Sequence, residues 1–273
     1  MRTGFIGLGS QGGPMARRII DAGDEVTLWA RRPESLVPYA ESGAKIVGRP
    51  AEVGGASDIV CLCVVADQDV LDVATGSDGV LSGMSEGGII VVHSTVHPDT
   101  CRRLAEEARE VGVTVVDAPV SGGGRAAEAG TLLVMVGGSD DDVARCRPVF
   151  EHYGDPVVHL GELGSGQTTK LLNNLLFTAN LATAVDTLGL GETLGLDTTR
   201  LAEVISHGTA NSFALGRVAS AGGTLDRIAM HAGELLRKDV GLLEGIADPH
   251  RQHEGDAVLA AAHAALERMG VRS

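Results

Sequence analysis

Residues 3–14 of the chain read TGFIGLGSQGGP, and they are the strongest indication of how the chain folds. Its apolar beginning, residues 3–8, is expected to form a buried β-strand, and a helix is expected to open at Pro14. The glycines between them follow the spacing G-x-G-x-x-G. In that pattern the first glycine allows a tight turn, the second lets the backbone approach a pyrophosphate, and the third lets the helix pack closely on the strand. The cofactor contacts expected from this turn are Gly7, Gly9, Ser10, Gln11 and Gly12.

The spacing alone is a weak signal, because the chain contains 38 glycines among its 273 residues. Its position between a strand and a helix strengthens it, since the N–H groups at a helix N-terminus bind anions. We therefore favour dinucleotide binding over a purely structural glycine turn.

The end of the second expected strand indicates which dinucleotide binds. NAD sites usually place Asp or Glu there to bond the ribose 2′-hydroxyl. This chain instead reads Ala30-Arg31-Arg32-Pro33, and a guanidinium group suits a 2′-phosphate. We expect NADP as the cofactor, with NAD as the alternative, and contacts from Ala30, Arg31 and then Arg32. A solvated pair of arginines is the other interpretation.

The first half of the chain alternates short apolar runs with helical segments, an order typical of a doubly wound parallel sheet. Most of these runs are apolar on both faces, as buried parallel strands are. The expected strands are 3–8, 25–29, 58–64, 88–93, 114–117, 131–136 and 157–160, and the clearest helices are 14–21, 100–111 and 140–153.

The second half of the chain contains no strand-like run from Gly164 onward. Residues 164–195 read as one long helix, whose end Gly189 and Gly191 weaken so that it is expected to break early. Further helices are expected at 198–206, 234–246 and 257–269. The sequence thus predicts an α/β fold, with a Rossmann doubly wound sheet in a domain of residues 1–162. An all-helical domain of residues 163–273 follows, and it begins with the long interdomain helix.

The composition is that of a globular protein, with 44% hydrophobic and 21% charged residues. A formal net charge of −14 and an aromatic content of 3% argue against a nucleic-acid partner and an anionic membrane surface. No apolar run approaches the length of a spanning helix, and the first strand leaves no room for a signal peptide, so we expect a cytoplasmic protein. No metal is expected, because His250, His253 and His263 lack a carboxylate or Cys at a known ligand spacing.

Five motifs occur in order along the chain, and together they resemble the β-hydroxyacid dehydrogenase family over nearly its whole length. They are GFIGLGSQGGPMA at 4–16, STVHP at 94–98, DAPVSGG at 117–123 with its continuation AGTLLVMVGG at 129–138, GSGQTTKLLNN at 164–174, and the pair Lys238-Asp239. The resemblance implies an oxidoreductase that transfers a hydride between NADP(H) and a small 3-hydroxy acid or semialdehyde acid. It also implies a homodimer or homotetramer, with the dimer contact in the helical domain.

Lys170 is the most informative candidate residue. The chain has only three lysines against nineteen arginines, and a partly buried Lys can release a proton where Arg cannot. Asn174 lies four residues later, on the same face of the expected helix. The resemblance implies that Lys170 is the general acid/base and that Asn174 orients the substrate; an ordinary surface lysine is the alternative.

The second glycine-rich turn, at Ser121, Gly122 and Gly123, follows a strand and is expected to form a nest of N–H groups for a small carboxylate. The resemblance implies that this is the substrate loop, although the residues alone also fit a flexible turn. It further implies substrate contacts from Thr95, His231 and Asp239. Beyond the arginines and the glycine turn, the cofactor contacts it implies are Val64, Val65, Thr95 and Lys238.

The chain departs from the family pattern at three positions, and these leave other functions open. Val92-His93 stands where the family often has Asp, His231 where it commonly has Phe, and Ala30 where NADP-dependent members often have Asn. An imine reductase is the first alternative, although that group generally replaces the lysine. A nucleotide-binding protein without turnover is the second, and it predicts the loss of Lys170 or Asn174, both of which are present.

Overall fold

The structure is a computed structural model that describes residues 1–247 and 254–271. The chain divides into two compact units, Met1–Lys170 and Leu171–Ser273, and each is described by itself. This division falls inside the long helix, eight residues after the domain boundary expected at 162/163. The expected boundary stays a prediction.

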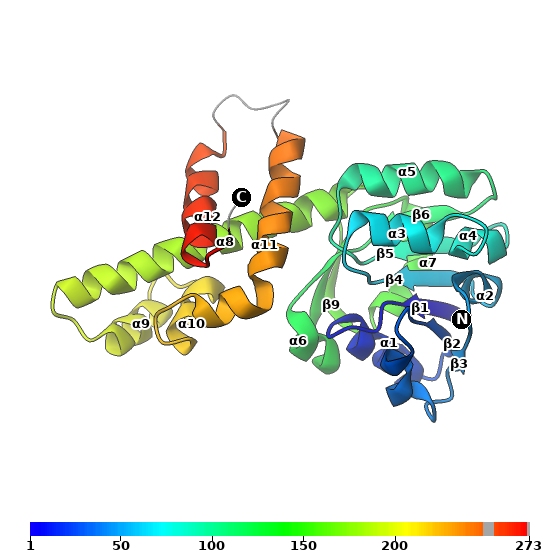
Figure 1. Ribbon diagram of the computed structural model, residues 1–273, viewed down its shortest axis with the longest axis horizontal. Coiled ribbons are helices and arrows are strands. Elements are labelled where there is room, and N and C mark those ends of the chain that lie inside the picture. The colour runs from blue at the N-terminus through cyan, green and yellow to red at the C-terminus, as the bar shows by residue number, and fades with distance from the viewer. Residues whose placement is uncertain (248–253, 272–273) are drawn as a thin grey trace. The chain divides into compact units, whose positions relative to one another are not determined.

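A six-stranded parallel sheet forms the centre of the first unit (Figure 1). The strands are arranged in the order β3-β2-β1-β4-β5-β6. Successive strands are thus added first on one side of β1 and then on its other side, as in a Rossmann fold. The predicted doubly wound sheet is therefore confirmed. Its strands are β1 (Arg2–Ile6), β2 (Glu25–Trp29), β3 (Lys45–Ile46), β4 (Ile59–Leu62), β5 (Ile89–Val92) and β6 (Thr114–Asp117).

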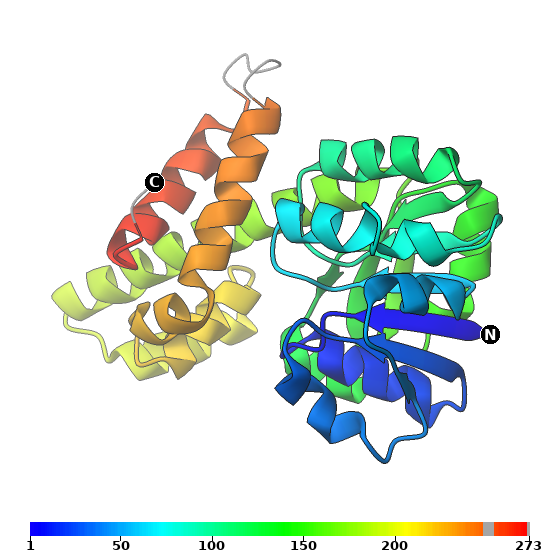
Figure 2. The same ribbon diagram turned by 45° about the vertical axis from the view of Figure 1, so that its right-hand side comes forward.

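Each central strand is buried on both faces, because its side chains alternate between two hydrophobic cores. In β4, for example, Ile59 and Cys61 enter one core, while Val60 and Leu62 enter the other. The first core is covered by α1 (Gly12–Asp21), α6 (Gly123–Ala129) and α7 (Asp140–Phe150). The second core is covered by α2 (Pro50–Gly55), α3 (Asp67–Ala74), α4 (Val80–Gly83) and α5 (Pro98–Arg109). Figure 2 shows these helices on the two sides of the sheet.

The last two expected strands do not join the parallel sheet. They belong to a separate three-stranded sheet formed by β7 (Val120–Ser121), β8 (Leu132–Val136) and β9 (Gly154–His159). β8 pairs antiparallel with β7 and parallel with β9. Hydrophobic runs do not encode which strands pair, and the two-residue strands β3 and β7 are too short to give a periodic signal. The short helices α2, α3, α4 and α6 and the 3₁₀ helix Pro33–Tyr39 were also not expected.

The described residues of the second unit form helices joined by loops, with no strand, and this unit has its own hydrophobic core. The long helix is confirmed as α8 (Ser165–Thr193), but the early break expected at Gly189 and Gly191 is wrong. Leu201 packs so closely on Gly191 that a side chain there would collide with it, so this glycine admits a neighbouring helix. The others are α9 (Thr198–His207), α10 (Phe213–Ser220), α11 (Asp226–Ala247) and α12 (Asp256–Arg268). α10 and the first two turns of α11 were not expected.

Candidate functional site

The glycine-rich turn between β1 and α1 has the geometry that its spacing predicts. Gly7 has a φ of 101°, and a side chain there would collide with the carbonyl of Cys63 at the end of β4. A side chain at Gly12 would collide with the carbonyl of Gly7, so α1 lies directly against the strand end. Gly9 instead faces open space, with no atom within 4 Å of the place a Cβ would take. The open space at Gly9 would let a pyrophosphate come close to the backbone.

The end of β2 lies beside this turn, since β2 and β1 are neighbours. The Arg31 guanidinium is exposed and forms an ion pair with Asp69, in the first turn of α3, with Nη1 3.0 Å from Oδ1. Asp69 is itself held, because its other oxygen accepts from the N–H of Ala66 at 3.2 Å. Ala30 is half-buried and Arg32 is exposed. Asp69 was not expected as the partner of Arg31, because 38 residues separate the two in the chain.

The ends of β4 and β5 bring three more predicted residues to the same edge of the sheet. The N–H of Val64 donates to Oγ of Ser94 at 2.8 Å, which ties the two strand ends together. Val65 is 62% exposed, so it offers an apolar surface beside the turn. Thr95 directly follows the buried Ser94 and is half-buried.

Asp117, at the end of β6, caps the first turn of α8. Its Oδ1 accepts from the N–H of Gly164 and its Oδ2 from the N–H of Gln167, both at 2.6 Å. The carboxyl is fully buried, and this burial raises its pKa to about 6 against the opposing effect of those hydrogen bonds. Gly166 allows this close contact, because a side chain there would meet both Asp117 and the carbonyl of Met135. Asp117 therefore fixes the start of α8 on the sheet.

The second glycine-rich turn joins β7 to α6. Gly122 and Gly123 have φ values of 132° and 73°, a backbone geometry that favours glycine. Ser121 is half-buried, and both glycines are exposed. A Cβ on the following Gly124 would lie 2.6 Å from the carbonyl of Ser10, so the two glycine-rich turns are adjacent. Gly124 was not among the expected site residues, although its lack of a side chain makes this contact possible.

Lys170 lies on the second turn of α8, at the end of the first unit, and is 8% exposed. Lys170 is therefore buried and not on the surface, and its role as general acid/base stays a prediction. Asn174 follows one turn later on the same face of α8 and is half-buried.

The helical unit orients the Asn174 amide through a side-chain pair. Its Nδ2 donates to Oδ2 of Asp239, on α11, at 2.6 Å. Asp239 is buried, and its Oδ1 lies 3.3 Å from the amine of Lys238. His231 is exposed two turns earlier on α11, where its Nδ1 donates to the carbonyl of Arg227 at 2.7 Å. The structure thus places Asn174, Asp239 and Lys238 together.

His93, one of the departures from the family pattern, lies in the core of the sheet. It is 2% exposed and stacks on Phe5. Nδ1 donates to the carbonyl of Ala118 at 2.7 Å, and Nε2 accepts from the Tyr153 hydroxyl at 3.0 Å. Burial lowers its pKa to about 4, so the ring is neutral at pH 7. His93 therefore supports the strand end that precedes Ser94.

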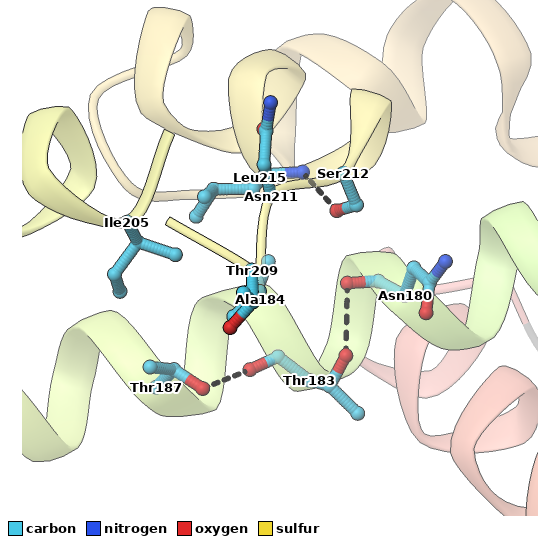
Figure 3. A pocket seen from close by; sticks show the side chains of 10 residues that line it. Asn180, Thr183, Ala184, Thr187, Ile205, Thr209, Asn211, Ser212 and Leu215 are labelled. Atoms are coloured by element: carbon cyan, nitrogen blue, oxygen red, sulfur yellow. Dashed lines mark hydrogen bonds between the residues drawn. The ribbon is translucent and has the colours of Figure 1, made fainter. Parts of the chain in front are cut away.

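The helical unit also contains a cavity of about 390 Å³, drawn in Figure 3. It lies between α8 and the segment 209–212, and Asn180, Thr183 and Thr187 face it from α8. All its lining residues are in the described part of the chain, and none of them is ionisable or was a predicted site residue. The cavity therefore offers hydrogen-bonding groups but no group for proton transfer.

Neither a metal site nor a membrane-spanning helix occurs among the described residues. No group of three His, Cys, Asp or Glu side chains there is arranged to hold a metal, and no helix there is long and apolar enough to cross a membrane. His263 forms an ion pair with Glu244 at 2.8 Å. His250 and His253 lie outside the described residues.

Comparison with known proteins gives two matches to family models that together cover most of the chain. Residues 2–161 match the NAD binding domain of 6-phosphogluconate dehydrogenase. Residues 164–271 match the model described as NAD-binding of NADP-dependent 3-hydroxyisobutyrate dehydrogenase. Both descriptions agree with a parallel sheet whose carboxyl edge carries a glycine-rich pyrophosphate turn, the architecture of a nicotinamide-dependent oxidoreductase.

Individual relatives agree with these matches. A 3-hydroxyisobutyrate dehydrogenase of Pseudomonas aeruginosa is 34% identical over 245 residues, covering 87% of this chain and 82% of that protein. A solved 3-hydroxyisobutyrate dehydrogenase of Mycobacterium tuberculosis with L-serine superposes with a TM-score of 0.83 at 26% identity, covering 96% and 91% of the two chains. A Streptomyces aurantiacus imine reductase shares the fold, with a TM-score of 0.70 at 21% identity over 99% and 93% of the two chains. The chain belongs to the β-hydroxyacid dehydrogenase family.

Proposed function

We propose that the chain is an NADP(H)-preferring dehydrogenase or reductase that interconverts a small 3-hydroxy acid and the corresponding semialdehyde acid. The observation that carries the proposal is the buried Lys170 on a helix whose first turn Asp117 anchors to the edge of the sheet that bears the dinucleotide turn. The names of the related dehydrogenases support the substrate class.

The residues at the sheet edge fit a nicotinamide dinucleotide. The open space above Gly9 leaves room for a pyrophosphate, and α1 has no side-chain cap at its N-terminus. Arg31 is exposed at the end of β2, where a 2′-phosphate would lie. The description of the matched model as NADP-dependent supports the same preference. Val64, Val65, Thr95 and Lys238 are proposed as the remaining cofactor contacts.

In this mechanism the bound nicotinamide supplies or accepts the hydride. The Ser121–Gly123 turn holds the substrate carboxylate with backbone N–H groups and the Ser121 hydroxyl. Thr95 and Asn174 orient the reacting oxygen through hydrogen bonds. During reduction Lys170 donates a proton to that oxygen, and during oxidation it accepts the proton back. Asp239 acts by holding the amide of Asn174, and His231 is proposed as a substrate contact.

An imine reductase is the second candidate, because His231 replaces the aromatic residue that is common in hydroxyacid dehydrogenases. This chain shares its fold with a solved imine reductase. Lys170 argues against it.

The test is oxidation of NADPH and NADH with semialdehyde acids, neutral aldehydes of equal carbon number and cyclic imines. We expect the semialdehyde acids to be reduced with the highest kcat/KM, and with NADPH. Equal kcat/KM for the neutral aldehydes would overturn the role of the Ser121–Gly123 turn. Turnover of imines alone would establish the second candidate.

We further propose that the chain forms a homodimer through its helical unit, and that it is cytoplasmic. Many large apolar side chains of this unit are exposed, a property that marks interaction surfaces. They include Leu172, Leu176, Leu190, Leu194, Phe213 and Met230, each at least 52% exposed. Sedimentation equilibrium should give twice the mass of the chain; a monomer would overturn this proposal.

A further inference from the structure

Gln167 is a fully buried amide on the first turn of α8, and its side chain bonds to the backbone on both sides of Thr95. Its Oε1 accepts from the N–H of Val96 at 3.1 Å, and its Nε2 donates to the carbonyl of Ser94 at 2.8 Å. Both groups of the amide are therefore used by the segment 94–96. All of these residues lie in the first unit.

The same amide is held from its own side. The backbone N–H of Gln167 donates to Asp117 at 2.6 Å, so the residue cannot shift without breaking the cap of α8. Ser94 in turn accepts from Val64 at the end of β4. Gln167 thus joins α8 to the ends of β4, β5 and β6.

We propose that Gln167 is a positioning residue that fixes Thr95 relative to Lys170. Lys170 follows three residues later on the same helix, at a distance where side chains are neighbours. The amide holds the backbone before and after Thr95, so it determines where the Thr95 hydroxyl lies relative to the Lys170 amine. This inference rests on the proposed roles of Lys170 and Thr95, and neither the sequence motifs nor the comparisons assign a role to Gln167.

The chemistry of the position explains why it is an amide. The segment 94–96 presents one donor, at Val96, and one acceptor, at Ser94, and a buried group left without a partner destabilises the structure. A primary amide offers one of each in a fixed plane. Methionine matches the length of the side chain but offers neither. A carboxylate offers two acceptors, one of which would face the Ser94 carbonyl, whereas a protonated carboxyl again offers one acceptor and one donor.

The first test compares Gln167→Met with wild type. We expect kcat to fall by roughly 10- to 100-fold, because misplacing a reacting group by about 1 Å can cost a factor near 10². The dissociation constant of NADPH should change much less than kcat, since Gly9 and Arg31 lie outside this network and only Val64 and Thr95 among the proposed cofactor contacts adjoin it. Thr168→Val is the matched control; its hydroxyl donates to the carbonyl of Gly164, directly before α8, at 2.9 Å, and not to the segment 94–96, so kcat should be retained.

The second test uses Gln167→Glu, which separates positioning from stability. Its kcat relative to wild type should be highest at low pH, where a protonated carboxyl restores both hydrogen bonds, and should fall as the pH rises. Gln167→Met should show a ratio that does not depend on pH. The charged and titratable groups around this site are Asp117 from β6, Cys101 and Arg102 from α5, Asp67 from α3 and Lys170 from α8. Dividing by the wild-type rate at each pH removes their titration.

A third readout does not need turnover. Hydrogen exchange at the Val96 amide should be at least tenfold faster in Gln167→Met than in wild type or Thr168→Val. If wild type reduces none of the substrates, the proposed function fails, and this exchange rate alone decides whether Gln167 holds the segment. A Val96 amide equally protected in all three proteins, or a kcat for Gln167→Met within twofold of wild type, would overturn the inference.

Discussion

Around their buried and half-buried candidate residues, the two units of this protein use different kinds of contact; the exposed Arg31 and His231 are outside this comparison. In residues 1–170, buried polar side chains bond to backbone groups: Ser94 to Val64, Asp117 to Gly164, and Gln167 to both neighbours of Thr95. In the helical unit, side chains bond to one another, as Asn174 does to Asp239. Backbone contacts fix whole segments, whereas a side-chain pair fixes one group.

This difference predicts how substitutions act in each unit. Removing a backbone-directed group in the first unit should displace several candidate residues at once. Removing one member of a side-chain pair in the helical unit should affect only its partner.

Lys170 should give the largest effect, because it is the proposed proton donor at the end of the first unit. Lys170→Ala should lower kcat by roughly 10² to 10⁴, the usual range for general acid–base catalysis. Lys170→Arg should be nearly as harmful, since Arg keeps the charge but cannot release the proton. The dissociation constant of NADPH should barely change, which fluorescence titration would measure.

The exposed Lys45, on β3, provides the matched control, and Lys45→Ala should leave kcat unchanged. If Lys170→Arg keeps most of kcat, the residue acts through its charge alone. The proton donor would then have to be sought elsewhere, with Lys238 as the next candidate.

The second effect concerns stability, because two buried groups of the first unit titrate in opposite directions. The pKa of His93 is lowered to about 4, so its contribution to stability is complete above about pH 6.5 and is lost as the pH falls toward 4. The pKa of Asp117 is raised to about 6, so stability is lost as the pH rises from about 4 to 6. Each titration is worth about 3 kcal/mol, and the two should nearly cancel in wild type between pH 4 and 6.

Single substitutions should reveal both titrations. In His93→Gln the free energy of unfolding should fall by about 3 kcal/mol from pH 4 to 6, because only the Asp117 titration remains. In Asp117→Asn it should rise by a similar amount over that range. Urea unfolding at several pH values measures both slopes, and His207→Gln, at an exposed histidine of α9, is the control. Parallel curves for wild type and His93→Gln would contradict this prediction.

The third effect lies in the helical unit and should be confined to Asp239 and the two side chains it contacts, Asn174 and Lys238. Asp239→Asn replaces the carboxylate that accepts from Asn174, and a hydrogen bond to a charged group is worth about 1.5–3 kcal/mol. We expect kcat/KM to fall by roughly 10- to 100-fold, with hydrogen exchange at the Val96 amide unchanged. Asp186→Asn, at the exposed partner of Arg268, should leave kcat/KM at the wild-type value. Faster exchange at Val96 in Asp239→Asn would contradict the contrast between the units.

The contrast also explains what the sequence could predict. The glycine turn, the parallel strands and α8 follow from local spacing, since each depends on residues close together in the chain. The bond from Asn174 to Asp239 spans 65 residues, and the bonds of Gln167 span 71 and 73. No periodicity encodes such pairs. Gln167 is a polar residue one turn before Lys170 inside the motif at 164–174, and this position is the sequence feature that could have pointed to it.

Errors in the expected elements have the same physical origin. Gly189 and Gly191 weaken a helix by propensity, but tertiary packing overrides propensity, and Leu201 of α9 fills the space at Gly191. β7 contains two residues and pairs antiparallel with β8, so neither its existence nor its direction was visible in the pattern.

The smallest expected effect returns to the first unit, at a residue held by a side-chain pair. Arg31 is 76% exposed and bonds only to Asp69 among the contacts described above. Because Arg31 is held by a side-chain pair, Arg31→Ala should act on one ligand group alone. We expect wild type to bind NADPH at least tenfold more tightly than NADH, about 1.4 kcal/mol, and Arg31→Ala to remove this preference by weakening NADPH. In Arg31→Ala the affinity for NADH and the kcat at saturating cofactor should equal the wild-type values.

Arg32→Ala should have a smaller effect on the preference for NADPH. Added salt should lower the affinity for NADPH more than the affinity for NADH, because exposed charges are screened. Equal dissociation constants for the two cofactors in wild type would remove the basis for assigning the 2′-phosphate to Arg31.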